Sequence, residues 1–155
     1  MNTENQMDIY DACRNGDIEQ LKAIHQNNPD AINQVNDVGF SPLTLAVYSN
    51  QEEAVKYLLD QKVNIDQRDR AGNNAAMGAV FKGYLNQVEI LLNANSDVNL
   101  QNFDGATALS YAATFGKADI AKVLLDAGAD PNIKAAQGNS PFDYAKMRNH
   151  TDENA

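Results

Sequence analysis

The sequence predicts an all-α solenoid, in which short helix pairs with β-turn or hairpin tips stack on one another. Three observations predict it: a glycine, an alanine and a pair of leucines each recur at an interval of 33 residues. The glycines are Gly39, Gly72, Gly105 and Gly138. The alanines are Ala46, Ala79, Ala112 and Ala145, and the leucine pairs are Leu58-Leu59, Leu91-Leu92 and Leu124-Leu125. Several columns that agree at one period indicate a repeat protein.

Each unit of the repeat reads as turn, helix, turn, helix, most clearly in residues 104–132. Gly105 supplies the positive-φ freedom that a tight turn requires, and Thr107 can cap the first helix. Gly116 ends that helix, and Gly128 ends the second one. One such unit cannot bury its own apolar faces, so we expect stability to arise largely at the interfaces between neighbouring units.

This arrangement resembles the ankyrin repeat. Residues 104–132 fit that family's pattern at the Asp-Gly turn, along both helices and at the closing Gly-Ala-Asp with its following asparagine. The resemblance covers about residues 7–149 and implies one domain of four to five repeats, caps included. The implied segments are an N-terminal cap (7–35), full repeats (36–68, 69–101 and 102–134), a truncated C-terminal cap (135–149) and a polar tail (150–155).

Two departures from the family pattern affect the expected stability. The family's Thr-Pro-Leu-His tetrapeptide reads SPLT, NAAM, TALS and SPFD here, so the hydrogen bonds that its histidine makes between repeats are in question. Gly78 lies inside a first helix, where glycine costs up to about 1 kcal/mol relative to alanine. We therefore expect the repeat 69–101 to open most easily.

Composition and charge narrow the function classes. The net charge of −9 disfavours a polyphosphate partner or an anionic membrane surface. No apolar stretch approaches the roughly 20 residues of a membrane span, and the N-terminus lacks the pattern of a signal peptide. The single Cys13 cannot form an internal disulfide. These features predict a cytoplasmic protein that binds neither nucleic acid nor membranes, and we expect it to be a monomer.

The sequence offers little for catalysis. Its two histidines, His25 and His150, are interpreted as surface residues, and Cys13 as a small buried residue. Phosphate-binding glycine loops and His-Glu-x-x-His are absent, so we expect no enzyme activity, cofactor or metal. Asn149 begins a glycosylation sequon and Asn99 stands in a context where ankyrin asparagines are hydroxylated, but repeat turns explain Asn99 equally.

The resemblance also implies a partner surface. In ankyrin proteins, partner contacts concentrate on a concave face formed by the turn tips and the first helices. The residues predicted to bind a partner there are Phe40, Tyr48, Arg70, Asn73, Phe81, Lys82, Phe103, Asp104 and Phe115. Aromatic and arginine side chains are favoured anchors at protein interfaces. The alternative is that some of these aromatic side chains pack between repeats and stabilise the stack. Two other tyrosines are interpreted as structural: Tyr57 on a second helix, and Tyr111 in the core.

The predicted function is therefore a non-enzymatic protein–protein interaction module that holds a partner protein on its concave face. The alternative is a regulatory or immunity-type inhibitor that covers the active site of a partner enzyme. Assaying a bound enzyme with and without this chain would distinguish the two functions.

Overall fold

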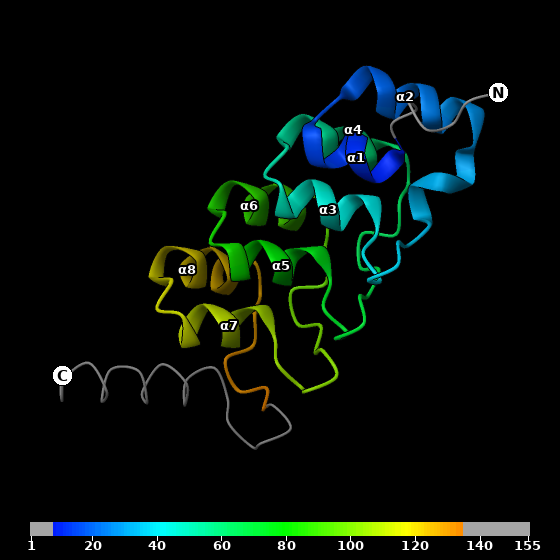
Figure 1. Ribbon diagram of the computed structural model, residues 1–155. Coiled ribbons are helices and arrows are strands. Elements are labelled where there is room, and N and C mark those ends of the chain that lie inside the picture. Colours follow the sequence, from blue (N-terminus) through cyan, green and yellow to red (C-terminus); the bar gives the residue numbers. More distant parts are fainter. Residues whose placement is uncertain (1–7, 135–155) are drawn as a thin grey trace.

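Short α-helices follow one another in pairs through the computed structural model, which describes residues 8–134 (Figure 1). The helices are α1 (Ile9–Asn15), α2 (Ile18–Asn27), α3 (Pro42–Tyr48), α4 (Glu52–Asp60), α5 (Ala75–Lys82), α6 (Leu85–Asn93), α7 (Ala108–Thr114) and α8 (Ala118–Asp126), with a 3-10 turn η1 (Pro29–Asn33) after α2. This confirms the predicted helical solenoid. The repeat boundaries stay a prediction, and the ranges 135–149 and 150–155 lie outside the described residues, together with Gly138, Asn149 and His150.

The helices form two rows (Figure 1). In the first row α1 packs on α3, α3 on α5, and α5 on α7. Each of these helices also packs on the helix that follows it in sequence, which belongs to the second row. Among the described residues, no helix is long and apolar enough to cross a membrane.

Local sequence signals set the helix ends. Ser41 caps α3 by accepting a hydrogen bond from the amide of Thr44 (3.1 Å), and Pro42 occupies the first turn. Thr107 caps α7 in the same way, and Ser110 completes a capping box by accepting from the Thr107 amide (2.8 Å). The turn glycine Gly105 has φ 80°, which confirms the left-handed backbone expected from the sequence.

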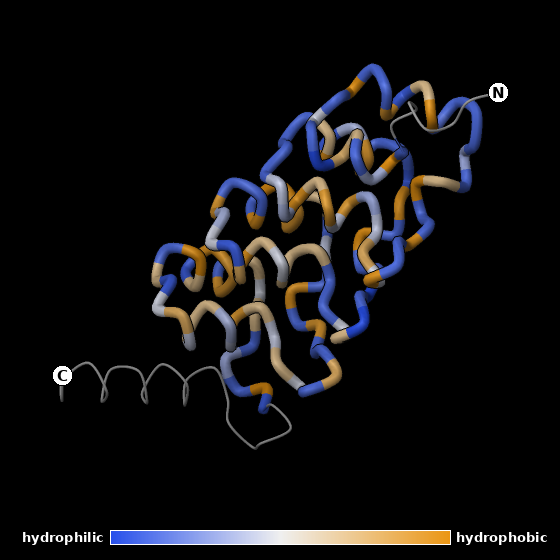
Figure 2. Tube along the Cα trace, in the orientation of Figure 1, coloured by the Kyte–Doolittle hydropathy of each residue, from blue (hydrophilic) through white to orange (hydrophobic). Residues whose placement is uncertain are grey.

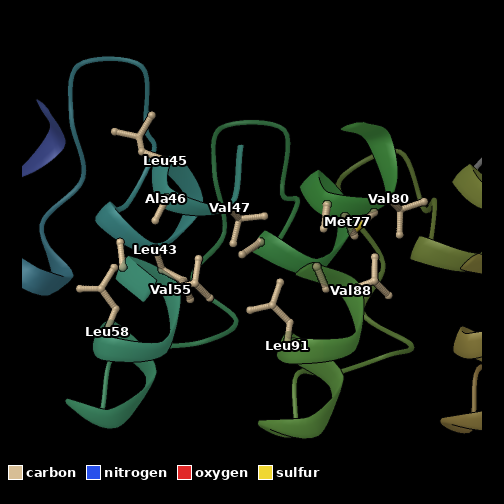
Figure 3. Close-up of a cluster of buried hydrophobic side chains, with 14 of the residues drawn as sticks. Leu43, Leu45, Ala46, Val47, Val55, Leu58, Met77, Val80, Val88 and Leu91 are labelled. Atoms are coloured by element: carbon tan, nitrogen blue, oxygen red, sulfur yellow. The ribbon is translucent and has the colours of Figure 1, made fainter. Parts of the chain in front are cut away.

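The core lies between the two rows and between successive helix pairs. Leu58 in α4 and Leu91 in α6 occupy equivalent places in two consecutive pairs, and neither is exposed (Figure 3). Val47 of α3 is also fully buried, between its own pair and the next. Apolar segments recur along the helices of both rows, whereas polar segments recur in the connections at the helix ends (Figure 2). Each pair therefore buries its apolar surface against its neighbours.

A repeated hydrogen bond joins successive units on the side of the second helices. The side-chain oxygen of Asn33 accepts from the amide of Asn64 at 3.0 Å, and that of Asn99 accepts from the amide of Asp130 at 2.7 Å. Asp66 takes the same place in the middle of the stack and accepts from the amide of Asp97 at 3.1 Å. Asn33, Asp66 and Asn99, which stand at the repeat interval of 33 residues, thus link the repeats.

Asp66 also binds two side chains of the next unit. Its carboxylate accepts from Asn74 Nδ2 (3.1 Å) and from the hydroxyl of Ser96 (2.9 Å). Asn74 caps α5 at the same time, by accepting from the amide of Met77 (2.9 Å). This chain lacks the histidine of the family pattern and joins its repeats through a different polar network, which is centred on the Asp66 carboxylate.

Candidate functional site

The hairpin tips are built by an aspartate or asparagine three residues before each turn glycine. Asn102 Oδ1 accepts from the amides of Asp104 (3.0 Å) and Ala106 (2.9 Å), while the Asn102 amide donates to the Ala106 carbonyl (2.9 Å). Asn36 and Asp69 make the equivalent bonds in the two preceding tips. Because each tip satisfies its own backbone groups, it presents its remaining side chains from a fixed frame.

Adjacent tips stack through the residue two positions before the glycine. The side chain of Arg70 lies against Gly39, and its guanidinium donates to the Asp37 carbonyl. The ring of Phe103 lies against Gly72, where an added Cβ would be 2.8 Å from the ring. The Phe103 amide also donates to the Ala71 carbonyl at 3.0 Å. The positions predicted as partner contacts from their column are therefore also contacts between repeats.

Arg68 is a residue of this surface that the column analysis did not identify. Its guanidinium donates to the carbonyls of Gly72 (3.2 Å) and Gln101 (2.7 Å). It also lies 5.9 Å from the centroid of the Phe103 ring, within range of a cation–π contact. Its position beside Asp69, at the start of a tip, was the only signal in the sequence. Arg68 thereby fixes the ring of Phe103, which is 68% exposed.

Two aromatic side chains from successive first helices meet at the protein surface. Phe81 of α5 and the C-cap residue of α7, Phe115, lie edge to face with centroids 5.6 Å apart and an interplanar angle of 83°. Their exposed fractions are 59% and 37%. Tyr111 of α7 lies 6.0 Å from Phe115. Edge-to-face contact is a favourable arrangement, so the two phenylalanines hold each other in place while remaining accessible to a partner.

The remaining aromatic residues predicted to bind a partner are half-buried. Phe40 and Tyr48 lie edge to face at 5.3 Å, and Phe40 packs against the core. Burial raises the pKa of the Tyr48 phenol, with smaller contributions from Asp69 and Tyr111. These two rings support the stack as well as lining its surface, which was the alternative interpretation of the sequence.

Tyr111 and Asn73 belong to one polar cluster. Asn102 Nδ2 donates to the Tyr111 hydroxyl (2.8 Å) and to Asn73 Oδ1 (2.9 Å). The Tyr111 hydroxyl lies 3.4 Å from the same Asn73 oxygen. Burial is the main cause that raises the pKa of Tyr111, which is half-buried and packs against the core rather than lying inside it as expected. Asn73 is half-buried and engaged within the fold.

The predicted charged contacts, Lys82 and Asp104, are both exposed. The Lys82 ammonium lies 6.0 Å from the centroid of the Tyr84 ring, at the start of the next helix. Asp104 stands at the tip of its hairpin, where its backbone amide donates a hydrogen bond to the Asn102 side chain.

Comparison with known proteins identifies the repeat. Residues 9–102 match the family described as "Ankyrin repeats (3 copies)", and residues 91–145 match "Ankyrin repeats (many copies)". The chain belongs to the ankyrin-repeat family. This membership confirms the resemblance seen in the sequence, and protein–protein interaction is the general role of ankyrin repeats.

Three curated relatives share part of this ankyrin-repeat chain. A BTB/POZ domain-containing protein 3 from Schizosaccharomyces pombe is 33% identical over 78 residues, which are 50% of this chain and 15% of the relative. An L-asparaginase from Dirofilaria immitis is 44% identical over 69 residues, 44% of this chain and 12% of the enzyme. Ankyrin repeat and SAM domain-containing protein 6 from Rattus norvegicus is 31% identical over 77 residues, 49% and 9% of the two chains. The matches thus cover a small part of each relative.

Cys13 and His25, the side chains considered for catalysis, are each packed within the ankyrin-repeat fold. Cys13 is fully buried, and burial raises the pKa of its thiol to about 12, which opposes formation of a nucleophilic thiolate. His25 is half-buried, and its Nδ1 lies 2.7 Å from the Tyr57 hydroxyl, which ties α2 to α4. Among residues 8–134, no three His, Cys, Asp or Glu side chains are placed to hold a metal ion. Asn99, the possible hydroxylation site, uses its side-chain amide to bind Asp130 and Gly128.

Proposed function

We propose that this ankyrin-repeat protein binds another protein, without catalysis, on the surface formed by its first helices and hairpin tips, the concave face of the fold. The observation that carries the proposal is the exposure of three phenylalanines on that surface: Phe81, Phe103 and Phe115. A large ring exposed to water is unfavourable in isolation, whereas aromatic side chains are enriched at the centres of protein interfaces.

The rigidity of this surface favours binding. Phe81 and Phe115 hold each other edge to face, and Phe103 is held by Gly72 and Arg68. Side chains that are fixed before binding lose little conformational entropy when a partner arrives. A standard protein interface of about 1,600 Å² in total suits a scaffold of this size.

Two phenylalanine substitutions test the proposal. Affinity capture from the source lysate with the original chain and with the Phe81→Ala/Phe115→Ala double variant should recover a partner only with the original. Because both rings are partly exposed, the variant should keep its helical circular dichroism and most of its stability. Leu125→Ala is a matched control, since Leu125 is a large exposed residue (47%) in the second row of helices. Equal recovery by both chains would refute the proposed surface.

The same capture distinguishes a scaffold from an inhibitor. If the partner is an enzyme, its activity should be measured with and without a stoichiometric amount of this chain, and loss of activity would establish an inhibitor.

We further expect a monomer located in the cytoplasm. The charge of −9 also indicates that the chain has no affinity for nucleic acid. Light scattering after gel filtration and a filter-binding assay with DNA and RNA would test the monomer and the nucleic-acid expectation.

A further inference from the structure

The positive side chains of the concave face are engaged within the protein. Arg68 donates to two backbone carbonyls, and Arg70 donates to the carbonyl of Asp37. The Lys82 ammonium is directed to the ring of Tyr84. These cations are therefore partly committed to holding the tips and the helix ends, rather than free to meet an acidic partner.

Two carboxylates of the same face, unlike that of Asp69 in its tip, are not engaged in this way. Asp37 and Asp104 are exposed, and within residues 8–134 no hydrogen bond or ion pair involves either side chain. Asp104 lies next to the aromatic cluster through Asn102, which accepts from the Asp104 amide (3.0 Å) and donates to the Tyr111 hydroxyl (2.8 Å). Asp104 also contributes to the raised pKa of Tyr111, which agrees with their proximity.

The N-terminal end of this face repeats the combination of carboxylate and apolar surface. A hollow of about 370 Å³ lies between α1 and the first tip, and Val35 and Val38 on its wall are 45% and 53% exposed. Asp8 and Asp37 contribute carboxylates to the same wall. Arg14 also lines the hollow, but its guanidinium pairs with Asp11 at 2.5 Å. Two separate places on the face thus present exposed carboxylates beside apolar side chains.

We propose that the partner protein is recognised through a segment in which arginine or lysine stands beside apolar residues. The positive side chain lies between Asp104 and the rings of Tyr111 and Phe115, and an apolar neighbour covers Phe81. A carboxylate and an aromatic ring both attract a cation, and the net charge of −9 attracts a basic segment from a distance. This inference rests on the proposed function and adds the chemistry of the partner.

A peptide library tests the inference without knowledge of the natural partner. Random 12-residue peptides displayed on phage are selected on the immobilised chain, and the enriched peptides are then synthesised and titrated by fluorescence anisotropy. We expect enrichment of arginine or lysine next to leucine, phenylalanine or similar residues. Asp104→Asn should weaken binding of these peptides by about three- to tenfold, and added salt should weaken it too. Asp126→Asn removes the same charge from an exposed position on α8 and should leave the affinity unchanged.

The variants separate the failure of this inference from the failure of the proposed function. If Phe81→Ala weakens the peptides but Asp104→Asn does not, the concave face binds and the basic segment is wrong. Enrichment of acidic or uncharged peptides would overturn the inference in the same way. If neither substitution has an effect, or if the library yields no binder, the concave face itself is contradicted. Circular dichroism of each variant confirms that the comparison is made on folded protein.

Discussion

The ring of Tyr48 lies over Gly78, a residue of the next helix pair. A β-carbon added at Gly78 would be 2.7 Å from Cε1 of that ring and 3.2 Å from its hydroxyl oxygen. Gly78 is buried inside α5, and Tyr48 also packs edge to face on Phe40, with ring centroids 5.3 Å apart. The glycine that looked only like a weak point of the helix therefore makes room for a side chain of the preceding repeat.

This contact predicts that the effect of Gly78→Ala on the free energy of unfolding will have opposite signs with and without the Tyr48 ring. In the original chain the added methyl group displaces the Tyr48 ring, so we expect a loss of stability instead of the gain that helix propensity alone would give. In a Tyr48→Ala background the same change should stabilise by about 0.5–1 kcal/mol. A double-mutant cycle measured by urea unfolding gives the coupling between the two residues. Equal effects of Gly78→Ala in both backgrounds would show that the ring imposes no constraint.

The opening of the repeat 69–101 remains a prediction. Native-state hydrogen exchange would test it, because amides of α5 and α6 should exchange at lower opening free energies than those of α3 and α4. Matching protection in the two helix pairs would contradict it and would indicate that the Tyr48 contact compensates for the glycine.

A substitution inside the stack should be costly, whereas one on its outside should not. Leu91 is fully buried in α6, so Leu91→Ala should destabilise the chain by about 2–5 kcal/mol through lost burial and a cavity. Leu125→Ala is the matched control, because Leu125 is 47% exposed on α8. Urea denaturation of both variants measures the difference. A loss below about 1 kcal/mol at Leu91 would be incompatible with its place in the interior.

The sequence was sufficient to predict the periodic parts of this structure. The interval between glycines and the buried leucines determines where each helix pair begins and which side it buries, since a repeat that recurs must pack on a copy of itself. The caps at Ser41 and Thr107 are local signals and could be recognised in the same way. Contacts that join non-equivalent positions of two units could not be predicted, because they do not recur at the repeat interval.

The candidate surface contains contacts that the periodicity of the sequence does not predict. The half-burial of Phe40, Tyr48 and Asn73 was not predicted, and Tyr48 shares its column with Phe81, which is exposed. This half-burial depends on which side chain the next repeat happens to carry, such as the glycine under Tyr48. Arg68 was missed for the same reason, since its partners are backbone carbonyls that only the stacked tips bring together.

The carboxylate of Asp66 should be important for coupling between repeats. It accepts hydrogen bonds from Asn74, from Ser96 and from the amide of Asp97, and the first two of these residues are buried. Asp66→Ala leaves those donors without their acceptor and should cost about 2–4 kcal/mol. Asp66→Asn should cost less, because asparagine fills the equivalent position at Asn33 and Asn99.

The control for this substitution is Asp60→Ala, at an exposed position at the end of α4. It should change the free energy of unfolding by no more than about 0.5 kcal/mol. Comparable losses at positions 60 and 66 in chemical denaturation would mean that removal of charge, and not the inter-repeat hydrogen bonds, determines the effect.

The buried thiol of Cys13 makes stability depend on alkaline pH. Burial is the main cause that raises its pKa to about 12, with a smaller increase from Asp8 and an opposing effect of Arg14. In the unfolded chain the thiol titrates near its ordinary value of about 8.5. The unfolded state therefore loses a proton at a lower pH than the folded state, and stability falls as pH rises from about 9 towards 12. Cys13→Ala removes this contribution, so its stability should fall less than that of the original chain between pH 7 and pH 10, by about 1–2 kcal/mol. Urea unfolding of both chains at the two pH values measures that difference, and parallel losses would show that the thiol titrates alike in both states.

The burial of Cys13 also predicts its reactivity. At pH 8 a thiol reagent should modify the folded chain slowly and the urea-unfolded chain at the rate of an ordinary exposed thiol. Rapid modification of the folded protein would place Cys13 at an accessible surface instead.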